Sequence, residues 1–232
     1  MSHPTILITG ANRGIGLELA TQFAADGWQV IACCRNPAAA DTLQTLAEAN
    51  DAVEIHALEV TDYARMAALS VELGDRPIDV LLSNAGIYGP RGVVLGEVSA
   101  DDWWTVLEVN TIAPLMLAQA FVEQVAASER KLIAVISSKM GSIADNGSGG
   151  SYFYRSSKTA VNQVFKCLSI DLAGQGISVI CLHPGWVKTD MGGANAETGV
   201  DDSAAGLKAI LQSAGAAQNG HFLNFDGSEI PW

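Results

Sequence analysis

Two residues four positions apart, Tyr154 and Lys158, have the types and the spacing for proton transfer. They stand in SYFYRSSK, directly before an apolar run that predicts a helix, so both side chains would lie on one helix face. A free tyrosine has a pKa of about 10, and a nearby ammonium is expected to lower that pKa. Tyr154 would then exchange a proton with a carbonyl or an alcohol. The alternative is an ordinary solvated helix start. Tyr152, six residues from Lys158, is interpreted as a packing or pocket residue.

Three further polar residues suit the same chemistry. Ser137 and Ser138 end an apolar strand-like run, and a hydroxyl there can hydrogen-bond a reacting oxygen. Asn110 lies in the middle of a helical pattern, where asparagine is unfavourable. We expect its amide to hold a water that joins Lys158 to solvent, and the alternative is a simple helix irregularity.

A glycine-rich turn follows the first strand-like run. TGANRGIG contains Gly10, Gly14 and Gly16, which would permit a tight turn, close approach of a pyrophosphate, and close packing of the next helix on the sheet. The helix N-terminus would face the phosphates with free N–H groups and the positive end of its dipole. A glycine turn without a ligand is the alternative reading of this motif.

The end of the second strand-like run distinguishes between cofactors. A carboxylate there would bind the ribose 2′-hydroxyl of NAD, but this chain has Arg35 in ACCRNP. An arginine would hold a 2′-phosphate, and Arg13 in the glycine turn would add a second cation. The sequence therefore favours NADP(H). Glu59 after the third run is expected near the adenine, and Asn84 and Gly86 after the fourth are expected beside the dinucleotide.

Short apolar runs alternate with helical segments along the chain. The runs are 5–9, 28–34, 52–58, 78–83, 131–137, 177–183 and 220–225, and the helical segments are 14–26, 38–49, 62–73, 100–128, 152–174 and 201–214. Continuous apolar strands are typical of a parallel sheet buried on both faces. We predict an α/β fold over residues 1–232. It is a single doubly wound Rossmann-type domain with a seven-stranded, mainly parallel sheet and helices on both faces. Ligands bind such sheets at the carboxyl ends of the strands.

Composition excludes several classes of protein. The formal net charge is −12, so a nucleic-acid surface is not expected, and an anionic membrane would repel the chain. No apolar run is judged to reach membrane-spanning length and no signal peptide is expected, so the protein is predicted to be cytoplasmic. The four cysteines lack metal-ligand spacing and are expected to be small buried residues in a reducing compartment, with no metal site.

These motifs together resemble the short-chain dehydrogenase/reductase family. The resemblance is carried by TGANRGIG, NAG at 84–86, Asn110, Ser138, YRSSK and HPGWVKTDM at 183–191. Within that family, ISSKMGSI, YFYRSSKTAVN and the ending DGSEIPW are most similar to sniffer-like carbonyl reductases and C-factor-like proteins. One departure is Glu59, where the family usually has aspartate.

The resemblance implies a role for each motif. It implies a catalytic tetrad of Asn110, Ser138, Tyr154 and Lys158, with the second serine of the pair acting. The implied NADP(H) contacts are Gly10, Asn12, Arg13, Gly14, Ile15, Gly16, Arg35, Glu59, Val60, Asn84, Ala85, Gly86, Tyr154, Lys158, Pro184, Gly185, Val187 and Thr189.

The expected activity is NADPH-dependent reduction of a small ketone or aldehyde, with Tyr154 as the general acid. Two alternatives stay open: a non-catalytic dinucleotide-binding signalling or sensor protein, and a 3-oxoacyl reductase, which would need a basic patch for an acidic carrier. The loop from Met191 to about Asp201 is expected to close over a small-molecule carbonyl or alcohol substrate. The apolar helices at 100–128 and 152–174 are expected either to pair between copies, as a homodimer or homotetramer, or to pack on their own sheet.

Overall fold

The sheet has seven strands, and every adjacent pair is parallel. The computed structural model describes residues 3–232. The strands are β1 (Thr5–Thr9), β2 (Gln29–Cys34), β3 (Val53–Ala57), β4 (Val80–Ser83), β5 (Leu132–Ile136), β6 (Ser178–His183) and β7 (Phe222–Asn224). Their order across the sheet is β3-β2-β1-β4-β5-β6-β7. The predicted doubly wound sheet is confirmed, and it is wholly rather than mainly parallel.

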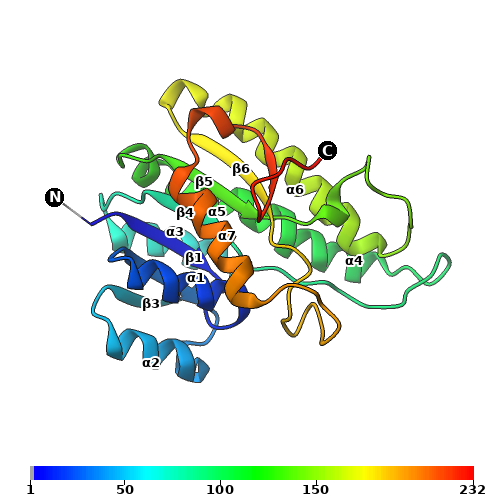
Figure 1. The fold of residues 1–232 in the computed structure, drawn as a ribbon, viewed down its shortest axis with the longest axis horizontal. Helices are drawn as coiled ribbons and strands as arrows, with labels where there is room; N and C mark the ends of the chain where they lie inside the picture. The colour runs from blue at the N-terminus through cyan, green and yellow to red at the C-terminus, as the bar shows by residue number, and fades with distance from the viewer. Residues whose placement is uncertain (1–2) are drawn as a thin grey trace.

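Helices cover both faces of this sheet (Figure 1). They are α1 (Gly14–Ala25), α2 (Asp41–Ala49), α3 (Tyr63–Leu73), α4 (Ala100–Leu107), α5 (Ala113–Ala126), α6 (Tyr152–Asp171) and α7 (Val200–Ser213). On one face, α1, α2 and α7 bury side chains such as Phe23 and Leu207 against the sheet. On the other face, α3, α5 and α6 bury Met66, Phe121 and Phe165. The central strands are covered on both faces, so their residues are apolar without alternation, whereas the edge strand β3 (VEIHA) alternates apolar and polar residues.

The segment predicted as one helix over 100–128 is divided by a π-helical turn at Glu108–Ile112. Taken together, residues 100–126 are long and apolar enough to span a membrane by length and composition, so the sequence-based statement that no segment reaches that length is wrong on this measure. In the fold, α5 packs against β4, β5 and α3, where Leu117 and Phe121 are buried in the core. The packing therefore accounts for the apolar composition of α5.

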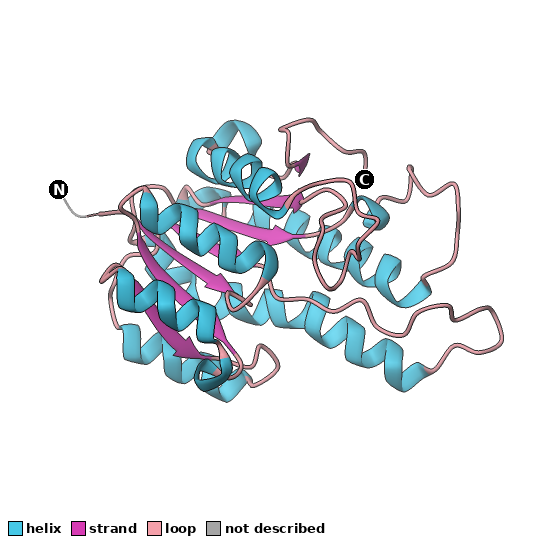
Figure 2. Ribbon diagram, turned by 60° about the horizontal axis from the view of Figure 1, so that its bottom comes forward, coloured by secondary structure: helices cyan, strands magenta, loops and turns pink. Residues whose placement is uncertain are grey.

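The strands all point toward one edge of the sheet, and long loops project from it (Figure 2). From β1 the chain continues to β2 on one side, and from β4 it continues to β5 on the other side. The space between the ends of β1 and β4 is therefore a topological switch point. In doubly wound sheets this edge is where ligands bind. The segments that follow β1 to β6 carry the residues that the sequence singled out, either in the loops or on the helices after them.

Candidate active site

The turn after β1 depends on glycine at two positions. Gly10 has φ +68°, a left-handed conformation, and a Cβ there would lie 3.0 Å from Ala85 Cα. Gly16 lies in the first turn of α1, and a Cβ there would be 2.4 Å from Gly10 O and 2.5 Å from Asn84 Nδ2. Helix α1 therefore begins so close to the turns after β1 and β4 that no side chain fits at position 16.

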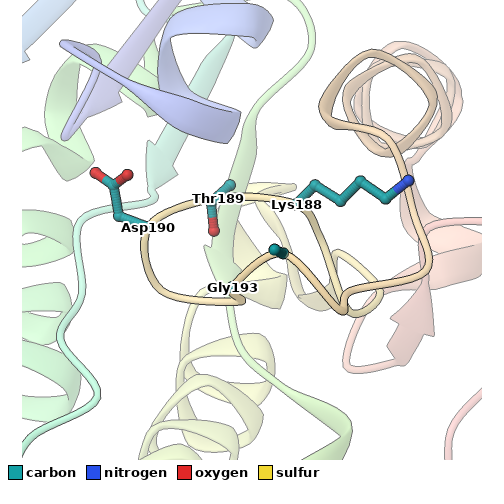
Figure 3. Close-up of a pocket in the computed structure, with 5 residues that line it drawn as sticks. Lys188, Thr189, Asp190 and Gly193 are labelled. Atoms are coloured by element: carbon teal, nitrogen blue, oxygen red, sulfur yellow. The ribbon is translucent and has the colours of Figure 1, made fainter.

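The N-terminus of α1 is left available to an anion. Arg13 is the N-cap residue, and its guanidinium has no acceptor for the helix N–H groups. A hollow of about 570 Å³ lies in the loop after β6, lined by Lys188, Thr189, Asp190, Gly193 and Ala194. Figure 3 shows Lys188 and Asp190 pointing in opposite directions from this loop, with Thr189 between them. Thr189 Cγ2 would lie 3.3 Å from a Cβ on Gly14, so the hollow adjoins the glycine turn.

Asn84 joins the turns after β1 and β4. Its Nδ2 donates to Thr9 O at 2.8 Å and to Gly10 O at 3.2 Å. The Thr9 hydroxyl in turn accepts the backbone N–H groups of Asn84 and Ala85. The Asn84 side chain thus holds the backbone of the β1 turn, and the neighbouring Gly86 lies against Asn110 and Lys158. A Cβ on Gly86 would lie 3.2 Å from Asn110 Oδ1 and 3.6 Å from Lys158 Nζ.

The two arginines expected at a 2′-phosphate have different partners. Arg35 follows β2, and its Nε lies 3.7 Å from Glu59 Oε2, which brings two of the predicted cofactor residues together. Arg13 instead pairs with Asp190 in the loop after β6, at 2.6 Å. Both pairs are exposed, so each is worth little in stability and either arginine is free to exchange its partner. Val60, next to Glu59, is buried.

The loop after β6 folds back on itself. Pro184 O accepts the buried Ser203 hydroxyl at 2.6 Å. Gly185 has φ +85°, and a Cβ there would lie 3.0 Å from Phe225 Cε1. Val187 forms a bridge with Thr198, which closes the loop at its base. The predicted contacts in PGWVKT therefore lie on an ordered loop beside the glycine turn.

Tyr154 and Lys158 both lie in the first turns of α6 and are almost fully buried, with 9% and 4% of their surfaces exposed. Lys158 Nζ donates to Ile136 O at the end of β5, at 2.8 Å, and lies 5.7 Å from the centre of the Tyr154 ring. The predicted pair therefore shares one side of the helix. Tyr152 points to the surface, with 39% of its area exposed.

The pKa of the tyrosine runs opposite to the sequence-based expectation. Burial raises the pKa of Tyr154 to about 12, the Tyr88 ring adds to the rise, and the Ser138 hydroxyl opposes it. Burial also lowers the pKa of Lys158 to about 8. The expected lowering by the ammonium is not found: Lys158 is not among the groups that shift the pKa of Tyr154, and removal from water disfavours the charged form of each residue. Tyr154 is thus held as a neutral proton donor.

The geometry separates the two serines. The Ser137 hydroxyl is buried and donates to Asn162 Oδ1 at 2.5 Å, so it is engaged in the protein interior. Ser138 starts a short 3₁₀ turn, Lys139–Gly141, and its hydroxyl accepts Met140 N–H at 3.2 Å. That hydroxyl also lies near enough to the Tyr154 phenol to oppose the rise in its pKa. Ser138 is therefore the serine that faces the phenol.

Asn110 occupies the π-helical turn between α4 and α5 and is 1% exposed. Its amide donates to Ile87 O at 2.8 Å and Ser157 Oγ at 3.0 Å and accepts Ile87 N–H at 2.9 Å. A carboxamide offers two donors and two lone pairs, so three of its four hydrogen-bonding positions are used by the protein. One Oδ1 lone pair remains for the water expected from the sequence, and that relay stays a prediction.

Sequence reasoning missed three residues of the site. Ser157 is fully buried and joins Asn110 to the backbone carbonyl of Tyr154, and its place within YRSSK was the signal available. Tyr88 stacks on Tyr154, and it is the second residue after the NAG motif. Asp190 pairs with Arg13, a contact between distant parts of the chain for which the sequence carries no signal.

Comparison with known proteins identifies the family. The family model for short chain dehydrogenases matches residues 4–200. The chain belongs to the short-chain dehydrogenase family. This short-chain dehydrogenase superimposes on the carbonyl reductase Sniffer of D. melanogaster with a TM-score of 0.94 and 35% identity, each chain being covered completely. The NADPH-bound carbonyl reductase from chicken fatty liver gives a TM-score of 0.93 and 35% identity, again over both whole chains.

Sequence similarity also extends to a relative that is not named as a reductase. C-signal of Myxococcus xanthus is 35% identical over 167 residues, which is 72% of this chain and all of that protein. The resemblance to sniffer-like carbonyl reductases and C-factor-like proteins is therefore confirmed. As a short-chain dehydrogenase, the protein is an oxidoreductase of a family that binds nicotinamide dinucleotides.

We expect Gly16→Ala to weaken dinucleotide binding by about tenfold or more, because the added methyl forces the start of α1 away from the β1 turn. Titration of the purified variant with NADPH and with NADH, followed by fluorescence, measures the effect. Gly147→Ala is the control, since open space surrounds that glycine. Unchanged affinity in the folded Gly16 variant would contradict the role given to this turn.

We expect Lys158→Met to change how stability depends on pH. The pKa of Lys158 is about 8 in the fold, below its ordinary value of 10.5, so the native state binds fewer protons between these values. The wild type should therefore gain about 2 kcal/mol relative to the variant between pH 7 and pH 10. Urea unfolding at both pH values measures this gain. Lys188→Met, which removes an exposed lysine, is the control, and parallel pH profiles for wild type and Lys158→Met would refute the expectation.

Proposed function

We propose that the protein is an NADP(H)-dependent carbonyl reductase that converts a small ketone or aldehyde to an alcohol. The observation that carries this proposal is the convergence of Ser138, Tyr154, Lys158 and Asn110 beside the glycine turn, at one edge of the sheet. The similarity to Sniffer and to the NADPH-bound chicken carbonyl reductase supports it.

The protein's own residues suit the dinucleotide. The glycine turn leaves no room for side chains near the start of α1, where a pyrophosphate would lie against free N–H groups. Arg35 follows β2 where an NAD-binding protein carries a carboxylate, and this favours a 2′-phosphate. The backbone of Gly86 and the Lys158 ammonium would line the nicotinamide ribose, and the loop at Pro184–Thr189 would line its ring.

Tyr154 would act as the general acid. A substrate oxygen placed between the Ser138 hydroxyl and the phenol would accept hydrogen bonds from both. NADPH held by these residues would supply the hydride for the carbonyl carbon. Tyr154 then transfers its proton to the oxygen, completing the alcohol, and Lys158 stabilises the phenolate until it is reprotonated. The high pKa of Tyr154 keeps it protonated for this direction.

The similarity to C-signal supports a second candidate, a dinucleotide-binding signalling protein without turnover. A binder of that kind has no use for a buried lysine beside a buried phenol, since burying both costs stability. A panel of diketones and quinones incubated with NADPH separates the two candidates. Oxidation of NADPH by any of them supports the reductase, and no turnover across the panel supports the binder.

We expect Tyr154→Phe to lower kcat by about 10³-fold, because the variant keeps the ring and loses the proton donor. NADPH absorbance at 340 nm measures turnover, and fluorescence titration should show NADPH affinity within about threefold of wild type. Tyr152→Phe removes an exposed hydroxyl two residues away and serves as the control. Near-normal turnover in Tyr154→Phe would refute the role of the phenol.

We expect Arg35→Asp to shift the NADPH-to-NADH ratio of kcat/KM toward NADH by about 100-fold, because a carboxylate repels a 2′-phosphate and accepts a ribose hydroxyl. Glu59→Gln is the matched comparison: it removes the carboxylate that pairs with Arg35 and should keep or raise the NADPH preference. Steady-state kinetics with both cofactors measure the ratio. An unchanged ratio in Arg35→Asp means that the phosphate is recognised elsewhere.

A further inference from the structure

Tyr88, in the loop between β4 and α4, lies against the proposed acid. Its ring stacks on the Tyr154 ring with centroids 4.6 Å apart and planes inclined by 21°. Aromatic rings at this separation and angle attract each other through an offset face-to-face contact. No residue of α6 itself covers Tyr154 in this way, within the described part of the chain, because Tyr152 points to the surface.

The chain fixes the backbone on both sides of Tyr88. Both the N–H and the carbonyl of Ile87 are bonded to the Asn110 amide. After Tyr88 the chain turns at Gly89, where φ is +78° and a Cβ would lie 2.6 Å from Val106 Cγ2. The backbone of Tyr88 is therefore fixed on one side by the hydrogen bonds of Ile87 and on the other by a turn that requires glycine at position 89.

The same amide also holds the backbone of Tyr154. Asn110 Nδ2 donates to Ser157 Oγ, and that hydroxyl donates to Tyr154 O at 2.8 Å. Tyr88 and Tyr154 are thus linked twice, once through their rings and once through the buried Asn110 amide. The hydrogen bonds of Asn110 therefore fix the backbones that carry the two rings relative to each other.

The outer side of the Tyr88 ring is held as well. Its hydroxyl lies 2.9 Å from Ser151 Oγ, at the start of α6. The Arg91 guanidinium lies 4.5 Å from the ring centre, within the range of a cation–π contact, and Arg91 donates to Met191 O in the loop after β6. Three loops of the site, after β4, β5 and β6, therefore meet at Tyr88.

We propose that Tyr88 is a positioning residue that holds the Tyr154 phenol in the orientation for proton transfer and forms the adjoining wall of the substrate site. The inference rests on the proposed function. A tyrosine ring turns about two side-chain bonds, and a misplacement of the phenol oxygen by about 1 Å costs about 10²-fold in rate. The stacked ring blocks that rotation, and it limits the size of a carbonyl substituent on its side of the phenol.

Kinetics of two variants test the proposal. Tyr88→Leu removes the ring and should lower kcat by about 10- to 100-fold on the best carbonyl of the panel, while the dissociation constant for NADPH stays within about threefold. Tyr88→Phe keeps the ring and loses only the Ser151 contact, so it should restore most of that rate. If Tyr88→Leu keeps the wild-type kcat, or if its loss appears only as weaker NADPH binding, the proposal is overturned.

A second measurement needs no turnover. The chain has four tyrosines, so protein labelled with ¹³C at tyrosine Cζ gives four resonances, and Tyr154→Phe identifies one of them. Tyr88→Leu should shift the Tyr154 resonance through loss of the ring current, and Tyr88→Phe should leave it near its place. An unmoved resonance in Tyr88→Leu overturns the proposal. If the wild type reduces no carbonyl compound, the proposed function fails, and this resonance alone decides whether Tyr88 fixes Tyr154.

Discussion

The parallel direction of all seven strands is the constraint on which the site depends. Because every strand ends at the same edge of the sheet, the turns after β1, β2, β4, β5 and β6 are brought together although they are far apart in sequence. At the switch point between β1 and β4, the contacts of Thr9 and Asn84 join two of these turns directly. Gly16 lets the helix start against them. The place proposed for the dinucleotide depends on that close approach.

Burial has opposite consequences for the two titratable residues of the site. Removal from water raises the pKa of the Tyr154 phenol from 10.0 to about 12 and lowers that of the Lys158 ammonium from 10.5 to about 8, so burial favours the uncharged form of each residue. The phenol therefore keeps its proton near neutral pH, as a residue proposed to donate that proton must. Burying Lys158 destabilises its charged form, and the fold places this lysine where the proposed reaction would use it.

One buried amide organises the hydrogen bonds around Tyr154. Asn110 stands in a π-helical turn, and such turns occur often at functional sites because they add a residue without ending the helix. From there its side chain holds Ile87 and Ser157, and through them Tyr88 and Tyr154. A residue that looks unfavourable in a helix is thus the centre of the hydrogen-bond network, consistent with the rule that buried polar groups are paired.

Much of this protein follows from the sequence alone. Alternating apolar runs and helical segments, with glycines after the first run, determine a doubly wound parallel sheet, because only burial on both faces suits such strands. The spacing of Tyr154 and Lys158 determines that they share a helix face. Only the tertiary structure decided that burial raises the pKa of Tyr154, that Arg13 pairs with Asp190, and that Tyr88 stacks on the phenol ring. Desolvation and long-range contacts depend on which loops lie side by side in the folded chain, and local sequence patterns do not predict those neighbours.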